Sequence, residues 1–171
     1  MRTEAAKPKQ VYPEIKEESE EIEEIRMVFT IEKAKFKDFP SVYELICTLE
    51  ECRLDKKRFE EIYRSMLQNP DRYALLVART EKEVIGFADL RFEDLLHHAA
   101  KVAELLELVI NPQCRSEGVG QALFDKACPI AKERGCVQIE CSSNQRRTRA
   151  HAFYLRNGMK NDHYGFSLPL D

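Results

Sequence analysis

The stretch from Leu105 to Phe124 constrains the fold of this chain more than any other. Residues 105–110 are almost continuously apolar, as expected for a strand that is covered on both faces of its sheet. Pro112 cannot donate a hydrogen bond to a sheet ladder and therefore ends this strand. Apolar residues then repeat at helical spacing from Val119 onward. The stretch predicts a buried strand, a short turn and a helix.

Two glycines, Gly118 and Gly120, lie where the turn enters the helix. Glycine has no Cβ, so the backbone can approach a bound molecule closely at these positions. The first amides of a helix have no partner within the helix, and the helix dipole favours negative charge there. We therefore expect this turn to bind an anion, and a diphosphate held by backbone N–H groups fits it best.

Composition limits the functions that need to be considered. The 171 residues are 43% hydrophobic and 33% charged, which suits one soluble domain with a hydrophobic core. No window approaches the roughly 20 apolar residues of a membrane span, and the N-terminus lacks an apolar signal core. From Met27 onward, 22 acidic residues balance 22 basic ones. We therefore expect a cytoplasmic protein that binds neither nucleic acid nor membranes.

The N-terminal residues 1–26 differ from the rest of the chain. Residues 14–24 contain seven glutamates and one lysine, and large apolar side chains are few. Such a segment cannot bury enough surface to offset its chain entropy. We predict an acidic, mobile extension, with a docked helix over residues 14–26 as the alternative, followed by one domain over residues 27–171.

The six cysteines are the residues that would supply disulfides or a zinc site. None of them forms a C-x-x-C pair, and most lie in apolar runs. We expect free thiols that pack as small core residues.

Hydrophobic periodicity predicts the order β-α-α-β-β-β-α-β-α-β. Two helices in succession after the first strand suggest a cap over one end of the sheet. The helix that follows the glycine turn contains Pro129, so we expect it to kink or to end early. The helices are expected to begin near residues 38 and 55 and to span 118–134 and 147–156. The strands are expected at residues 27–35, 73–79, 83–92, 102–110, 137–142 and 164–170.

Two motifs resemble those of the GNAT superfamily of acyl-CoA-dependent N-acetyltransferases. The first is Arg115-Ser116-Glu117-Gly118-Val119-Gly120, placed after a strand and at a helix start. The second is Ala150-His151-Ala152-Phe153-Tyr154, followed by Gly158-Met159. The resemblance implies an α/β (α+β) fold with a mixed, mostly antiparallel sheet and a central parallel strand pair. It also implies acetyl-CoA as the cosubstrate, with its pyrophosphate at residues 115–120 and its pantetheine arm along Leu108, Val109 and Ile110.

Three side chains are candidates for the chemistry. Tyr154 would protonate the departing CoA thiolate, because a tyrosine with a pKa near 10 carries its proton at neutral pH. Its alternative role is that of a core aromatic residue beside Phe153. An ammonium substrate must lose a proton before it attacks, and Glu104 or Glu107 on the central strand would accept it. The alternative for either glutamate is a structural contact with an arginine.

Further pieces of the sequence resemble the aminoalkylphosphonate N-acetyltransferases, which acetylate small aminophosphonates and with which a divalent metal is associated. These pieces include Glu104 to Val109, Asn144 to Arg147, and the segment from Ala150 to Arg156. The resemblance implies a small primary amine as substrate. It implies that Asn144 and Arg147 contact the cofactor. Candidates for binding the substrate are His97, His98, Arg146 and His163, and the three histidines are also candidates for binding a metal.

Other acceptors and another class of protein stay open. Acidic residues on the expected cap helices would favour a polyamine or a protein or peptide amine, whereas the arginines before the last helix would favour an anionic substrate. A different class is a non-catalytic, acetyl-CoA-binding regulatory module. We expect a monomer or a homodimer.

Overall fold

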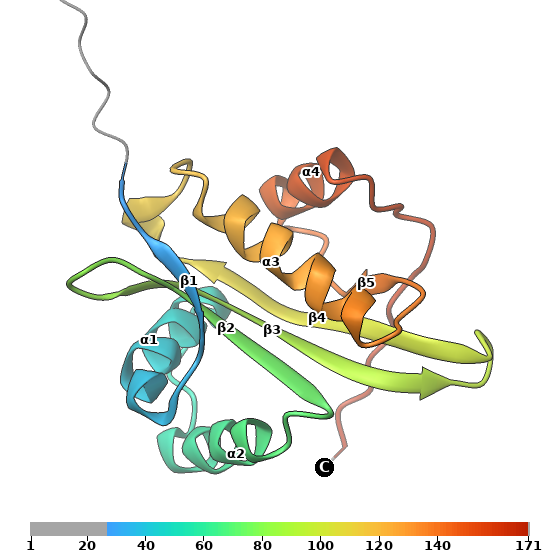
Figure 1. The fold of residues 1–171 in the computed structure, drawn as a ribbon, viewed down its shortest axis with the longest axis horizontal. Helices are drawn as coiled ribbons and strands as arrows, with labels where there is room; N and C mark the ends of the chain where they lie inside the picture. Colours follow the sequence, from blue (N-terminus) through green and yellow to red (C-terminus); the bar gives the residue numbers. More distant parts are fainter. Residues whose placement is uncertain (1–26, 171) are drawn as a thin grey trace, which may run out of the picture.

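A five-stranded sheet forms the frame of the domain in a computed structural model, which describes residues 27–170. The strands lie in sequence order, and only the pair formed by β4 and β5 is parallel (Figure 1). The mixed, mostly antiparallel sheet is thus confirmed, with its parallel pair at one end because no strand follows β5 between residues 27 and 170. The strands are β1 (Thr30–Lys33), β2 (Tyr73–Arg79), β3 (Val84–Leu95), β4 (Ala100–Ile110) and β5 (Ile139–Cys141).

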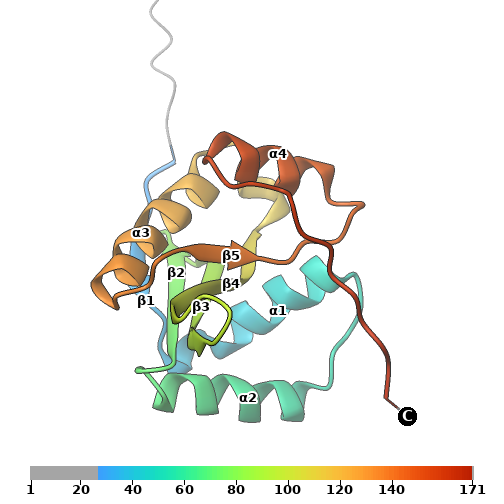
Figure 2. The same ribbon diagram turned by 90° about the vertical axis from the view of Figure 1, so that its right-hand side faces the viewer.

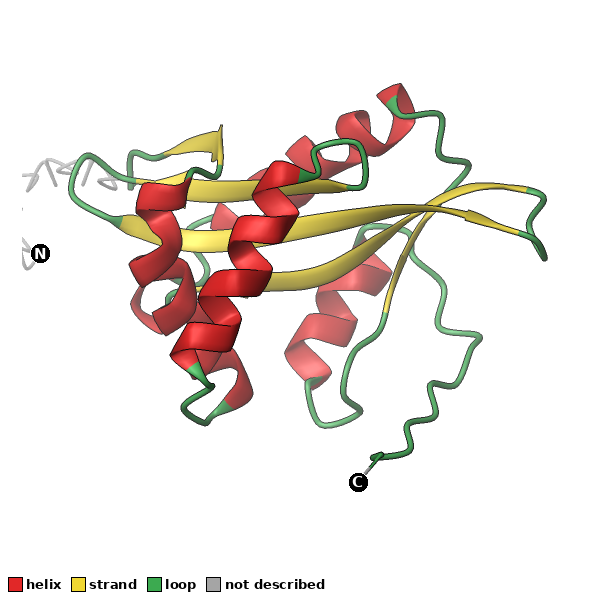
Figure 3. Cartoon of the chain, turned by 90° about the horizontal axis from the view of Figure 1, so that it is seen from below, coloured by secondary structure: helices red, strands yellow, loops and turns green. Residues whose placement is uncertain are grey.

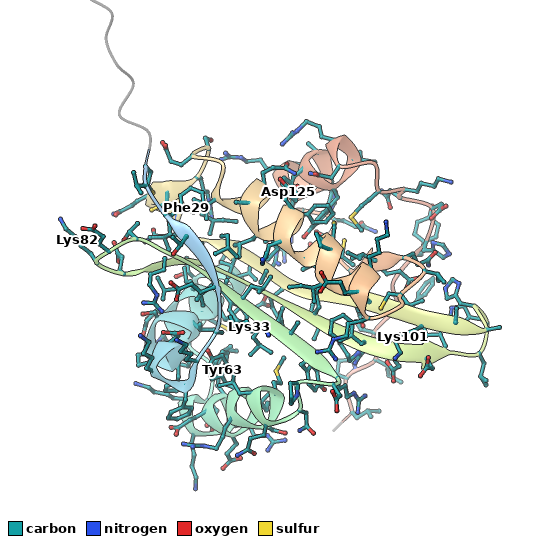
Figure 4. All side chains as sticks on the ribbon, in the orientation of Figure 1. Phe29, Lys33, Tyr63, Lys82, Lys101 and Asp125 are labelled. Carbon is teal, nitrogen blue, oxygen red and sulfur yellow. The ribbon has the colours of Figure 1, made fainter. Side chains whose placement is uncertain are left out.

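In the described part of the chain, four helices cover the two faces of this sheet (Figure 2). One face is packed by α3 (Val119–Glu133) and α4 (Thr148–Arg156), and the other by α1 (Phe39–Glu50) and α2 (Lys56–Gln68). Each face therefore has a hydrophobic core of its own. On the α1/α2 side, Tyr63 reaches up from α2 (Figure 4) and packs against Phe87 of β3 with ring centroids 6.5 Å apart.

The starts of the first two helices differ in how they are made. Asp55 caps α2, because its Oδ1 accepts the backbone N–H of Arg58 at 2.8 Å. Asp38 stands at the corresponding position before α1, but its side chain makes no capping bond there. A short 3-10 turn, η1 (Phe36–Asp38), precedes α1, and Asp38 is buried in an ion pair with Arg79.

The helix after the glycine turn runs without interruption through Pro129 to Glu133. The helix therefore does not end early at Pro129, and the chain leaves it at Gly135, whose φ is +76°, close to the predicted limit of residue 134. A second glycine matters on the neighbouring strand. A Cβ on Gly86 would lie 3.1 Å from Leu123 Cδ1 and 3.2 Å from Val119 Cγ1, so its absence lets α3 pack closely onto β3.

The last expected strand, residues 164–170, is not formed. This segment is an extended loop that makes no hydrogen bond to other parts of the described chain (Figure 3). Its four apolar side chains keep the alternation of a strand, but each is more than 80% exposed: Tyr164, Phe166, Leu168 and Leu170. Alternation alone does not make a strand, because a strand needs a neighbouring edge to pair with.

Two further points concern the ends of the chain and its surroundings. The acidic extension, residues 1–26, lies outside the described residues, so its predicted mobility stays a prediction. Within residues 27–170, no helix has both the length and the apolar character to cross a membrane.

Candidate active site

An open strand edge lies where β4 and β5 part. The parallel pair is joined only from Ala103 to Leu105 on β4, opposite Ile139 to Cys141 on β5. Beyond Leu105, β4 continues to Ile110 and stays paired with β3 on its other side. No strand of the described chain pairs with the β5 side of β4 there. The backbone groups beside Leu108, Val109 and Ile110 can therefore bond to an extended ligand.

The glycine turn closes one end of this edge. After β4, a 3-10 turn, η2 (Pro112–Cys114), leads to Ser116 with a φ of +72° and to Gly118 with a φ of +80°. Gly118 is the N-cap of α3 and offers no capping side chain, and a Cβ placed on it would meet no atom within 4 Å. The first helical hydrogen bond is donated by Ala122 to Gly118 O at 3.0 Å, so the amides just before Ala122 remain available to an anion.

The six residues of the motif contribute in different ways. Arg115, Ser116 and Glu117 are exposed, whereas Val119 is buried in the core under α3. Gly120 serves packing, because a Cβ there would lie 3.1 Å from Ile110 Cδ1. Val119 and Gly120 therefore offer a ligand their backbone alone, while the first three residues present side chains to solvent.

Tyr154 of α4 lies beside the end of β5. Its hydroxyl lies beside the thiol of Cys141, the residue at which β4 and β5 separate. Burial is the main reason that the pKa of Tyr154 is raised to about 12. Burial and the charge of Glu104 also raise the pKa of the Cys141 thiol. Tyr154 thus holds its proton at neutral pH next to the open edge.

The two glutamates of β4 have different partners. Glu104 forms an ion pair with the guanidinium of Arg91, its register partner on β3. Glu107 has no ion pair among residues 27–170, and its backbone N–H donates to Asp89 Oδ1 at 3.0 Å. Of the two carboxylates, that of Glu107 is the one that no arginine neutralises, so it is the better placed to accept a proton from an ammonium group.

Asp89 is a component of the site that sequence reasoning missed. It lies on β3 directly opposite Glu107, next to a bulge that leaves Leu106 unpaired in the register, and it is 1% exposed. Burial raises the pKa of Asp89 well above its usual range, and the adjacent Glu107 carboxyl raises it further. The available signal was a single acid within the apolar run from Val84 to Leu90.

The residues before α4 join the two helical layers. Arg147 Nη2 donates to Leu49 O at 3.1 Å and pairs with Glu50 Oε1 at 2.9 Å, at the end of α1. Asn144 Oδ1 accepts the backbone N–H of Arg146 at 3.0 Å and so shapes the turn into α4. The expected cofactor contacts of Asn144 and Arg147 stay predictions.

His97 and His98 lie side by side with ring centroids 4.3 Å apart, whereas His163 lies on a separate segment. His97 and His98 lie in the turn between β3 and β4, where His98 Nε2 is 3.1 Å from Glu140 Oε1. His163 lies in the C-terminal loop beside Asp162. The turn that carries His97 and His98 ends at Ala100, which is seven residues along β4 from Glu107, or about 23 Å at the rise of a strand. Over residues 27–170, no three metal-ligating side chains cluster, so the structure gathers no site for a divalent metal.

The comparison with known families places this architecture in one class of protein, the acetyltransferases. The model of the Acetyltransferase (GNAT) family matches residues 39–159, and the chain belongs to this family. Members of the family use acetyl-CoA as cosubstrate. The uncapped start of α3 and the open edge of β4 fit such a molecule, because one offers free amides to phosphates and the other offers backbone groups to amides of the pantetheine arm.

Two named relatives and one solved structure are similar to this chain over much of its length. The chain is 35% identical over 148 residues to the aminoalkylphosphonate N-acetyltransferase of Salmonella typhimurium. The matched stretch covers 86% of this chain and 96% of that enzyme. The chain is 30% identical over 105 residues to the spermidine N(1)-acetyltransferase of Thermoplasma acidophilum, covering 61% and 60%. In structure, it resembles a transcriptional regulator from Bacillus halodurans C-125 with a TM-score of 0.76, 22% identity and coverage of 84% and 100%. The structural likeness shows the fold alone.

Proposed function

We propose that this enzyme transfers the acetyl group of acetyl-CoA to the primary amine of a small molecule, and that its preferred substrate is an aminoalkylphosphonate. The identity to the Salmonella enzyme, which extends over almost the whole of that protein, carries the proposal. The site supports it, because binding groups for an acyl-CoA lie next to one free carboxylate and one protonated tyrosine.

The two proton-transferring groups approach the open edge from opposite faces of the sheet. Glu107 shares a face of β4 with Val109, which packs in the α1/α2 core. Tyr154 packs in the core under α3. An amine that enters on the α1/α2 side would therefore meet Glu107, while the sulfur of a thioester in the slot would lie toward Tyr154.

The chemistry then needs no covalent enzyme intermediate. Acetyl-CoA supplies an acetyl thioester. The Glu107 carboxylate takes a proton from the substrate ammonium, so that an N–H bond breaks and an O–H bond forms. The freed nitrogen lone pair attacks the thioester carbonyl carbon, and the carbon–sulfur bond breaks. Tyr154 gives its phenolic proton to the thiolate that leaves. The surplus proton on the nitrogen is lost as the amide forms, which restores the Tyr154 phenol, and Glu107 releases its own proton to solvent.

Charge on the cap helices bears on the choice of substrate. Four of the five glutamates that would attract a polyamine are each paired with an arginine: Glu44, Glu50, Glu60 and Glu61. By contrast, Arg146 and Arg149 are exposed and form no ion pair between residues 27 and 170. An anionic phosphonate would find unneutralised guanidinium groups there.

The experiment is a screen for CoA release over aminophosphonates, polyamines, amino acids and peptides, with and without a divalent metal. We expect the highest kcat/KM for an aminoalkylphosphonate, and a larger loss for it than for the matching uncharged amine when Arg146 and Arg149 are both replaced by glutamine. Faster turnover of spermidine would assign a polyamine acetyltransferase. Binding of acetyl-CoA without acetylation of any amine would indicate a regulatory module.

Replacing Gly118 with alanine should weaken acetyl-CoA binding. At a φ of +80° an alanine is strained by about 1–2 kcal/mol, so the turn relaxes and the amides at the start of α3 shift. Loss of one hydrogen bond to a charged phosphate corresponds to about tenfold weaker binding. Isothermal titration with acetyl-CoA measures the change.

The matched control is Gly135→Ala, at the other end of α3. Gly135 has a φ of +76° and equally open surroundings, so its replacement should bring similar strain and a similar loss of thermal stability. Its affinity for acetyl-CoA should be that of the unchanged protein. Equal loss of affinity in both variants would show that strain in α3, and not the turn, weakens binding.

A further inference from the structure

Two adjacent carboxyl groups lie on the sheet beside the open edge: Asp89 is buried, and Glu107 is partly exposed. The two residues face each other across β3 and β4, and Asp89 Oδ1 is occupied by the backbone N–H of Glu107 at 3.0 Å. The other oxygen, Asp89 Oδ2, is buried and accepts no hydrogen bond. A buried carboxylate oxygen without a partner is costly, so this atom calls for an explanation.

No cation among residues 27–170 forms an ion pair with Asp89. Its register partner on β2 is Leu75, and the next polar side chain along the same face of β3 is Arg91, which is bound to Glu104. The charged group next to Asp89 is the carboxyl of Glu107, which helps to raise the pKa of Asp89. Two ionised carboxylates cannot bond to each other, because both only accept. One proton shared by the pair removes the repulsion between the two carboxylates and gives Asp89 Oδ2 a hydrogen-bond partner.

We propose that Asp89 is a positioning residue for Glu107, holding a proton at neutral pH and donating a hydrogen bond from Oδ2 to the Glu107 carboxylate. The proton resides on Asp89 because that group is 1% exposed, whereas Glu107 is partly open to solvent at the edge of the site. Its role in turnover rests on the proposed function, in which Glu107 accepts the proton of the ammonium group.

The proposal explains how the base keeps one orientation. Asp89 would hold Glu107 at two points, because its Oδ1 accepts the backbone N–H of Glu107 at 3.0 Å and its protonated Oδ2 would donate to the side chain. The Leu106 bulge increases the local twist of β4 and aims the next side chain, that of Glu107. A donor on the far side of the Glu107 carboxylate leaves its remaining lone pairs for the incoming ammonium group.

Infrared spectroscopy of the free enzyme tests the proton without any substrate. We expect a carbonyl stretch of a protonated carboxylic acid at neutral pH, absent in Asp89→Asn and shifted in frequency in Glu107→Gln, where the acceptor is changed. Asp38→Asn is the control, because Asp38 is as deeply buried but is paired with Arg79, and this variant should keep the band. No band in the unchanged protein, or a band that survives in Asp89→Asn, would overturn the proposal.

Kinetics with the best amine from the screen test the positioning role. Asp89→Leu removes the donor and should lower kcat about 10- to 100-fold, as expected for one hydrogen bond to a charged group, with the KM for acetyl-CoA unchanged. Asp89→Asn keeps an N–H donor and an oxygen acceptor, so it should lose no more than about threefold. An asparagine variant as slow as the leucine variant, or a leucine variant as fast as the unchanged enzyme, would exclude this role.

The two arms separate failure of this inference from failure of the proposed function. If no amine is acetylated, the proposed function fails, while the infrared spectra still decide whether Asp89 carries the proton. If an amine is acetylated and Asp89→Leu folds poorly, Asp89→Asn and the shifted band in Glu107→Gln provide the decision. Circular dichroism of each variant identifies those that fold.

Discussion

Replacing Glu107 with glutamine is expected to lower kcat/KM for the amine by about 10²- to 10⁴-fold at neutral pH, the range typical of a lost general base. The reason is that a small primary amine arrives as ammonium, and in the variant no carboxylate receives its proton. The KM for acetyl-CoA should not change, because the cosubstrate is held by the glycine turn and the edge of β4. Steady-state kinetics between pH 6 and about pH 10 should show the deficit shrinking as the free amine becomes more abundant.

Glu104→Gln is the matched control on the same strand. Its carboxylate is already engaged by Arg91, so its loss should reduce thermal stability more than it reduces the chemical step. If Glu104→Gln abolishes turnover while Glu107→Gln stays near the unchanged rate, the base is Glu104, and the pairing with Arg91 must open during the reaction.

Tyr154→Phe is expected to lower kcat about 10- to 100-fold, at and below the lower end of the range for general acid catalysis. The loss is modest because a thiol with a pKa near 8.5 leaves without much help. The pKa of about 12 also makes a prediction for the unchanged enzyme. Tyr154 loses its proton only as the pH rises through that value, so its deprotonation should not limit the rate below about pH 11.

Tyr164→Phe provides the control for the loss of a phenol. Tyr164 is 84% exposed in the C-terminal loop, so removal of its hydroxyl should leave kcat unchanged. Pre-steady-state measurement of CoA release tells a slower chemical step from slower product release. An unchanged rate in Tyr154→Phe would remove Tyr154 from the mechanism and leave it as a core aromatic residue beside Phe153.

Much of the fold could be predicted from local patterns. Residues 73–79 form a strand as expected, and α3 and α4 begin and end within one residue of their predicted limits. These elements have strong periodicity and clear end signals, such as Asp55 before α2 and Gly135 after α3. The predicted strand at residues 164–170 does not form, because alternation was the only basis for it and no neighbouring strand of the described chain pairs with this segment. Alternation shows which side chains would share a face, but not whether an edge is available for pairing.

The backbone part of the site, the glycine turn, could be predicted from the sequence, whereas the partners of its side chains could not. The glycine turn follows from the position of Gly118 between a strand and a helix. The contrast between Glu104 and Glu107 does not follow from sequence, because it depends on the register of β3 against β4 and on the bulge at Leu106. The same register places Asp89 of β3 directly opposite Glu107 of β4. Long-range pairings of this kind join residues 13 and 18 positions apart and leave no periodic signal.

The early end of the β4–β5 pairing has a consequence for the protein before it binds its cosubstrate. The outer half of β4, beyond Leu105, is an unprotected sheet edge although β4 is an inner strand by order. Such an edge can pair with any extended chain, including another copy of the protein. A bound pantetheine arm would cover it as a strand would. Binding of acetyl-CoA and pairing of this edge with a second copy would therefore exclude each other.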